Sequence, residues 1–157
     1  MSANFLVGVA VDHSDEIREP IMEYLAQIKK PGMKIFFVNA YKAISLSALS
    51  VPCDTMDKLL NQVNARIAEN EKIENHYKRM AEELGIPASF EFVVNQPSVG
   101  EALLKKFQEL NVHQIIMSKR NISNAQAKLF GRNSIYISQR SKIPVTIVPI
   151  PCANDKK

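Results

Sequence analysis

The feature that most constrains the fold is a run of seven apolar residues, Phe5 to Val11, which Asp12 ends. A run of this length is too short for a packed helix and indicates a strand that is buried on both faces. Residues 34–41 contain a second such run, at positions 35–38. Strands buried on both faces are typical of parallel sheets that are covered by helices on either side.

Three further strands are expected, at residues 88–94, 114–117 and 145–148, and Pro144 and Pro149 around the last one favour a sheet edge. Helical spacing of apolar residues predicts helices over 17–28, 98–110 and 54–84, the last being one long helix or a kinked pair. Residues 122–141 are ambiguous between strand and helix, and we expect a helix because parallel neighbours need a crossover. The predicted fold class is α/β, a three-layer α/β/α sandwich around a five-stranded parallel sheet.

The chain has 157 residues, of which 46% are hydrophobic, and this fits one domain over residues 1–151 with a short polar tail at 152–157. The longest apolar run is far shorter than the ~20 residues that a membrane span needs, so we expect a cytoplasmic protein without a membrane partner. Cys53 and Cys152 lie far apart in the sequence and are expected to be free thiols, whose role the sequence does not define.

Charge is distributed unevenly along the chain. Residues 1–117 carry 12 Lys and Arg against 15 Asp and Glu, whereas residues 118–157 carry eight against one. The basic segment favours an anionic partner there, with a solvated basic face as the alternative. We do not expect a nucleic-acid partner, because Phe130 and Tyr136 are the sole aromatic residues among these basic ones and no recognition motif is present.

Ligands of parallel sheets bind outside the carboxyl ends of the strands, where the strand order reverses. The residues that follow the predicted strands are therefore the candidates: Asp12, Asn39, Asn95 and the segment from Ser118. The three histidines have no metal-ligand spacing, so no metal site is expected. The sequence also lacks the G-x-S-x-G and G-x-G-x-x-G motifs, and we predict no catalytic residue.

Several of these features together resemble the universal stress protein family, whose fold is that of the adenine nucleotide alpha hydrolases. They are the end of the first strand at residues 11–14, the fourth strand running into a Ser/Arg/Asn-rich loop, a helix that begins near Gly131, and the closing residues 143–149. The resemblance implies the strand order 3-2-1-4-5, in which the first and fourth strands are neighbours. Asp12 and Ser118 would then face one crevice.

In nucleotide-binding members of that family the crevice holds ATP through a motif written Gly-x2-Gly-x9-Gly-Ser/Thr, whose glycines let backbone N–H groups approach the phosphates. The corresponding residues here are Ser118, Asn121, Gly131 and Arg132, with both spacings kept. Two glycines and the final hydroxyl are replaced, and this degenerate motif implies weak or absent binding of ATP and Mg²⁺. Basic residues around it could instead hold an anion: Lys119, Arg120, Lys128 and Arg132.

The resemblance implies further nucleotide-site residues. Asp12 would lie on the adenine or ribose side, Val38 and Met117 at the adenine wall, and Ser134 on the phosphate side. The full candidate set is Asp12, Val38, Met117, Ser118, Lys119, Asn121, Gly131, Arg132, Asn133 and Ser134. Asp12 alternatively caps the helix that follows it.

The function implied by the resemblance is a non-enzymatic stress-response module that acts as a homodimer through unidentified protein partners. Family members commonly dimerise through the last strand, and Val145, Ile147 and Ile150 are the expected apolar edge. The alternative function is an ATP-binding regulatory protein with slow or no hydrolysis.

Overall fold

The computed structural model describes residues 4–12, 15–41, 53–94, 98–119 and 133–150, with the main chain alone for residues 53–55 and 119. Among these residues, no helix combines the length and the apolar character that a membrane span requires. The predicted residues Asn95, Arg120, Asn121, Lys128, Gly131, Arg132 and Cys152 lie outside the described residues.

Five strands form one parallel sheet in the order β3-β2-β1-β4-β5, which confirms the predicted fold class and strand order. The strands are β1 (Phe5–Ala10), β2 (Met33–Tyr41), β3 (Ala88–Val94), β4 (Gln114–Lys119) and β5 (Val145–Pro149). The expected edge position of the last strand is also confirmed, since β5 pairs with β4 alone among the described strands.

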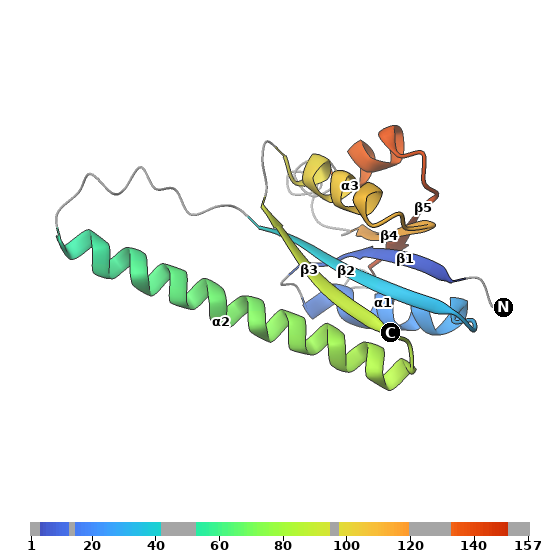
Figure 1. Cartoon of the computed structure of the whole chain (residues 1–157), viewed down its shortest axis with the longest axis horizontal. Helices are drawn as coiled ribbons and strands as arrows, with labels where there is room; N and C mark the ends of the chain where they lie inside the picture. The colour runs from blue at the N-terminus through green and yellow to red at the C-terminus, as the bar shows by residue number, and fades with distance from the viewer. Residues whose placement is uncertain (1–3, 13–14, 42–52, 95–97, 120–132, 151–157) are drawn as a thin grey trace.

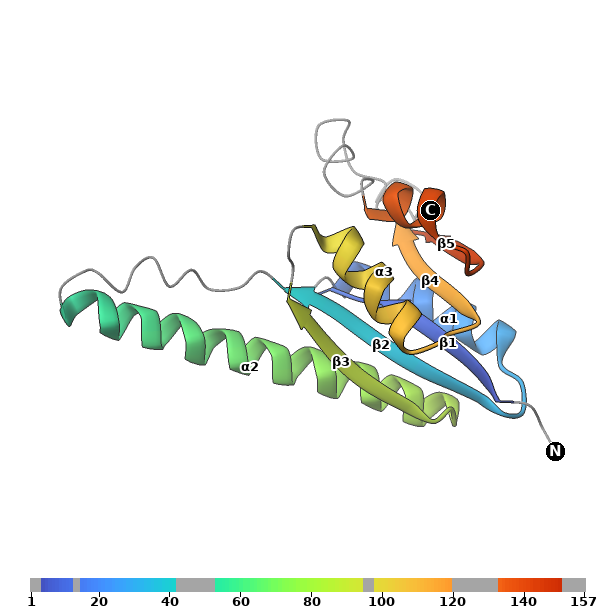
Figure 2. The same cartoon turned by 45° about the horizontal axis from the view of Figure 1, so that its top comes forward.

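Helices cover both faces of the sheet (Figures 1 and 2). The helices α1 (Arg18–Ile28) and α2 (Cys53–Leu84) lie on one face, while α3 (Val99–Glu109) and a helix at residues 133–140 lie on the other. The described part of segment 122–141 is therefore mainly helical, as the need for a crossover predicted. A short 3-10 turn, η1 (Asp15–Ile17), precedes α1, and no side chain caps α1 at its N-cap residue Ile17.

The two faces of β1 belong to two separate hydrophobic clusters. Val7, Val9 and Val11 pack on the side of α1 and α2, whereas Ala10 packs on the side of α3. Gly8 also faces α3, and a Cβ atom at this position would lie 2.5 Å from the Phe107 ring. Glycine at this position therefore allows α3 to approach the strand closely.

The α3 helix begins as its sequence predicts. Ser98 is the N-cap residue, and its Oγ accepts a hydrogen bond of 3.2 Å from the main-chain N–H of Glu101. This bond satisfies one of the N–H groups that a helix leaves unpaired at its start.

The α2 helix is one continuous helix of 32 residues, about 48 Å long at 1.5 Å per residue. It ends at Gly85, whose φ of 68° is the left-handed conformation that closes many helices. Its C-terminal part packs on the sheet through Ile73, Tyr77, Met80 and Ala81. Its N-terminal part projects beyond the sheet (Figures 1 and 2).

Candidate functional site

A cavity of about 100 Å³ lies at the carboxyl end of the sheet, where β1 and β4 are neighbours. Its polar lining consists of Asp12, Ser118 and Asn133. Its apolar lining comes from Ala10, Val11, Ile17, Ala40, Val99, Leu103 and Met117. A cavity of this volume has room for several water molecules, which a small ligand group could replace.

The strand order explains why the cavity is here. The chain runs from β1 into α1 on one face of the sheet, whereas the helix at residues 133–140, which comes between β4 and β5, lies on the other face. The connections after two neighbouring strands thus diverge and leave a crevice, the usual ligand position in open parallel sheets. The structure therefore brings Asp12 and Ser118 together at one crevice, as the strand order implied by the family resemblance led us to expect.

Asn39 holds the end of β1 beside this cavity. Its side-chain Nδ2 donates a hydrogen bond of 2.9 Å to the carbonyl of Val11, the residue before Asp12. The side chain is buried, and its Oδ1 has no hydrogen-bond partner among the described residues. A buried amide oxygen needs a partner, which a bound water or ligand can supply.

The other predicted residues have different environments. Met117 and Asn133 line the cavity, while Val38 is fully buried on the same side of the sheet and accepts a main-chain hydrogen bond from Val11. Ser134 is buried in the first turn of the helix at residues 133–140. Lys119 ends β4, and its side chain is outside the described part of the chain.

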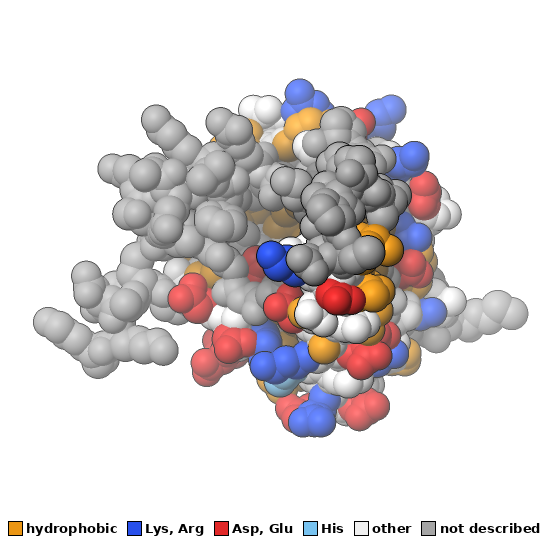
Figure 3. Space-filling model, turned by 90° about the vertical axis from the view of Figure 1, so that its left-hand side faces the viewer, with side chains coloured by type: hydrophobic (Ala, Val, Ile, Leu, Met, Phe, Trp, Pro, Cys, Tyr) orange, Lys and Arg blue, Asp and Glu red, His pale blue; other side chains and the backbone are white. Residues whose placement is uncertain are grey.

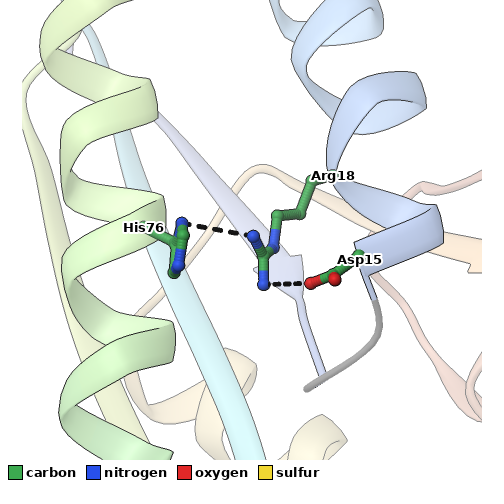
Figure 4. A network of polar contacts seen from close by, with 3 residues as sticks. All are labelled: Asp15, Arg18 and His76. Atoms are coloured by element: carbon green, nitrogen blue, oxygen red, sulfur yellow. Dashed lines mark hydrogen bonds and ion pairs between the residues drawn. The ribbon is translucent and has the colours of Figure 1, made fainter.

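A polar network joins α1 to α2 near this end of the sheet (Figure 4). The guanidinium of Arg18 forms an ion pair with Asp15 and a hydrogen bond of 3.2 Å with Nδ1 of His76. Burial, together with the positive charge of Arg18, lowers the pKa of His76 below its ordinary value. His76 is therefore held as a neutral acceptor for Arg18 near neutral pH.

Tyr77, the next residue on α2, is fully buried against Phe37, with ring centroids 5.0 Å apart. Burial, reinforced by the negative charge of Asp12, raises the pKa of its hydroxyl. That hydroxyl has no hydrogen-bond partner among the described residues. The phenol thus remains neutral and available as a donor on the α2 side of the sheet.

Comparison with known proteins connects this architecture with a family. The family model for universal stress proteins matches residues 6–149, from the second residue of β1 to the last residue of β5. The chain belongs to the universal stress protein family. The resemblance noted in the sequence is thereby confirmed over nearly the whole chain.

Individual members of the family differ widely from this one in sequence. Universal stress protein YxiE of Bacillus subtilis is 28% identical over 146 residues, which cover 89% of this chain and 95% of YxiE. A crystal structure of a universal stress protein in complex with cAMP matches with a TM-score of 0.67 at 20% identity, covering 96% of this chain and 100% of that one. An Arabidopsis thaliana family protein with AMP bound matches with a TM-score of 0.63 at 15% identity, covering 98% and 95%.

Some residues of the universal stress protein cavity were not among the predicted ones. Ile17, Ala40, Val99 and Leu103 contribute to its wall. Ala40 had a signal in the sequence, because it lies two residues after Val38 and so points to the same face of β2. Val99 and Leu103 are four residues apart on α3, and their helical spacing indicated a buried face without indicating that this face borders a cavity.

Proposed function

We propose that this universal stress protein is a stress-response module that binds adenine nucleotides weakly or not at all and acts without catalysis, as a homodimer that engages other proteins. The observation that carries the proposal is the presence of Ser118 in the wall of the crevice between β1 and β4. Ser118 occupies the position of the first glycine of the family's nucleotide motif, and its side chain brings atoms where a bare backbone would meet phosphate.

The cavity keeps features that suit a purine nucleoside. The carboxylate of Asp12 can accept hydrogen bonds from a ribose hydroxyl or an adenine amine, and Met117 and Leu103 supply an apolar wall for a base. The phosphate side is where the sequence departs from the family, through Ser118, Asn121 and Arg132. Relatives solved with cAMP and with AMP bound make monophosphates the first nucleotides to compare with ATP.

A non-enzymatic role is supported by the chemistry of the cavity wall. Of the described residues that line the cavity, Asp12 alone is ionisable. Phosphoryl transfer relies on cationic groups positioned around the phosphates, and the described residues of the lining contribute none. A bound nucleotide would then act as a ligand rather than as a consumed substrate.

Dimer formation through the last strand is supported by the exposed edge of β5. Ile147 is 37% exposed and Val145 is half-buried on the same face, whereas Ile150 is only 7% exposed and belongs to the hydrophobic cluster beside α1. Pairing of β5 with its copy would satisfy the main-chain groups of the edge and cover Ile147. The proposed edge therefore consists of Val145 and Ile147.

Calorimetric titration with ATP and Mg²⁺, AMP and cAMP at two salt concentrations tests the nucleotide part of the proposal. We expect no heat, or dissociation constants in the millimolar range, and no release of phosphate from ATP. An Asp12→Ala variant should remove any weak binding that wild type retains. Micromolar binding of ATP would contradict the proposal.

The second candidate function is an ATP-binding regulatory protein with slow or no hydrolysis. It is favoured by the retained spacing of the motif and by the four basic residues around it, Lys119, Arg120, Lys128 and Arg132. Charged side chains that replace neutral N–H groups would bind phosphate, and their affinity would fall as the salt concentration rises. Micromolar affinity that favours ATP over AMP and weakens with salt would establish this second function.

A further inference from the structure

The N-terminal part of α2 lies outside both hydrophobic clusters of the described residues. No residue of α2 before Ile73 belongs to either hydrophobic cluster among the described residues. We call residues 56–70 the α2 overhang, and Figures 1 and 2 show it projecting beyond the sheet. A helical segment of about this length is marginally stable in water unless something packs on it.

The α2 overhang carries an apolar stripe that consists of Met56, Leu60, Val63 and Ile67. Met56, Leu60 and Ile67 are 46%, 55% and 50% exposed, and they are three of the six exposed large hydrophobic side chains found among the described residues. Figure 3 views the molecule from the end where α2 projects and shows hydrophobic side chains among acidic and basic ones on that face. An apolar stripe on a solvated helix is a typical contact surface.

The apolar stripe is not a continuation of the face that packs on the sheet. At 100° per residue, the mean direction of the apolar stripe is turned about a quarter turn from that of Ile73, Tyr77 and Met80. The two surfaces therefore face different neighbours. The sheet of the same chain covers one of them, whereas Met56, Leu60 and Ile67 of the apolar stripe are about half exposed.

The spacing of the apolar stripe fits a second copy of the same helix. Its steps along the chain are four, three and four residues, which is the a/d spacing of a coiled coil and reads the same in both directions. A second copy that runs antiparallel therefore presents the same pattern, with Met56 opposite Ile67 and Leu60 opposite Val63. We propose that the apolar stripe is a self-association surface on which the α2 overhangs of two copies pack as an antiparallel helix pair.

The flanking charges and the helix dipoles agree with this arrangement. Antiparallel pairing places Asp57 opposite Asn64 of the second copy, so the acidic side chains do not face each other. It also aligns the two helix dipoles in opposite directions, which is their favourable relative orientation. The surface is self-complementary, as a two-fold interface requires.

The size of the apolar stripe sets the strength of the association. Four side chains per copy, three of them about half exposed, cover much less than the roughly 800 Å² per partner of a standard stable interface. The pair is therefore a weak one, with a dissociation constant of tens of micromolar or above. It is separate from the β5 edge, and the two interfaces can be tested independently.

Cysteine cross-linking tests the pairing in a chain whose Cys53 and Cys152 are replaced by serine. We expect the double variant Met56→Cys/Ile67→Cys to form disulfide-linked dimers under mild oxidation at least five times faster than Lys58→Cys/Ala65→Cys. The control pair has the same symmetry about the centre of the α2 overhang but lies on its opposite, exposed face. Either single cysteine of the stripe should cross-link as slowly as the control pair.

Three results would overturn the proposal. One is cross-linking of the control pair as fast as that of the stripe pair, and another is fast cross-linking of a single stripe cysteine, which would indicate parallel helices. The third is slow cross-linking together with slow modification of the stripe cysteines by a thiol reagent, which would show that the chain's own residues 42–52 cover the stripe.

Sedimentation at rising protein concentration provides a second readout that does not depend on introduced cysteines. Measured in an Ile147→Lys background, which lacks the β5 pairing, Leu60→Glu should weaken the remaining self-association at least tenfold. Asn61→Glu, one position off the stripe, should leave it unchanged in the same background. In an Ile147→Lys background the β5 pairing is removed, and cross-linking of the stripe pair should persist. Loss of cross-linking in that background would mean that β5 alone holds the copies together and would overturn the proposal.

Discussion

The side-chain amide of Asn39 is hydrogen bonded, at 2.9 Å, to the main-chain carbonyl of Val11. This bond fastens β2 to the end of β1, one residue before the carboxylate that lines the cavity. Asn39 therefore positions Asp12 without lining the cavity itself.

Replacing Asn39 with alanine should lower the free energy of unfolding by about 1–3 kcal/mol, because the buried carbonyl of Val11 loses a hydrogen bond. Urea denaturation measures this change. The matched control is Asn61→Ala on the exposed side of α2, which should change stability by less than about 0.5 kcal/mol. Equal effects of the two substitutions would contradict the positioning role.

A Gly8→Ala substitution should destabilise the protein by about 1–3 kcal/mol, because the new methyl group would lie 2.5 Å from the Phe107 ring. Thermal and urea unfolding report the loss. The double variant Gly8→Ala/Phe107→Leu should be more stable than the two separate losses predict, because the smaller side chain leaves room for the methyl group. If the changes in the free energy of unfolding of the two single variants simply add in the double variant, the Phe107 ring does not restrict the side chain at position 8.

Acidification should weaken the fold in part through His76. Its pKa is lower in the folded protein than its ordinary value of 6.5, so the unfolded chain binds more protons and stability falls as the pH drops through this region. His76→Gln should make the free energy of unfolding less dependent on pH between about 7.5 and 5.5. Burial lowers the pKa of His76 most, the positive charges of Arg18, Lys72 and Arg79 lower it further, and Asp15 raises it.

An Arg18→Gln variant tests the cause of that shift. Removal of the guanidinium takes away a positive charge beside the imidazole, so the pKa of His76 measured by NMR titration should rise toward its ordinary value. An unchanged titration would mean that burial and the charges of Lys72 and Arg79 account for the shift without Arg18.

The double reversion Ser118→Gly/Asn121→Gly should create or strengthen nucleotide affinity if these side chains block the approach of phosphate. We expect at least a tenfold gain for ATP by calorimetry over the wild type. Ser118→Ala/Asn121→Ala is the matched control, since it shortens both side chains but keeps their Cβ atoms. No gain in the glycine variant would exclude steric closure as the reason for weak binding.

Replacement of Ile147 by lysine should shift the protein toward one chain in sedimentation experiments, because a charge would be buried in the β5 pairing. Ile135→Lys is the control, since Ile135 is an exposed isoleucine on the helix at residues 133–140. A wild-type mass of one chain at micromolar concentration would contradict pairing through β5.

The sheet could be predicted from the sequence because its strands are buried on both faces. The runs at Phe5–Val11 and 35–38 have no polar break. The observed β1 and β2 agree with the predicted strands at 5–11 and 34–41 to within one residue at each end. The strand order came from the family resemblance, since periodicity carries no information on which strands are neighbours. The position of Asp12 and Ser118 at one crevice followed from that order.

Other features depend on tertiary contacts that periodicity does not encode. The pattern predicted α2 but not that its first half lies beyond the sheet, because an apolar helix face looks the same whether or not a partner covers it. Ile150 was expected at the dimer edge, yet it is buried beside Val148. The alternation of side chains along a strand could have predicted this burial, because residues 148 and 150 point away from the face that bears Val145 and Ile147.

The length of α2 amplifies any rotation of this helix about the point where it is anchored in the core. Met56 lies 17 residues from Ile73, the first residue that anchors the helix in the core, which is about 26 Å along a rigid rod. A tilt of only ten degrees at the anchor would therefore move the tip by about 4.5 Å. His76 and Tyr77 lie close to this anchor and contact Arg18 and Phe37. A small rotation of α2 at these contacts would therefore produce a large displacement of its N-terminal end.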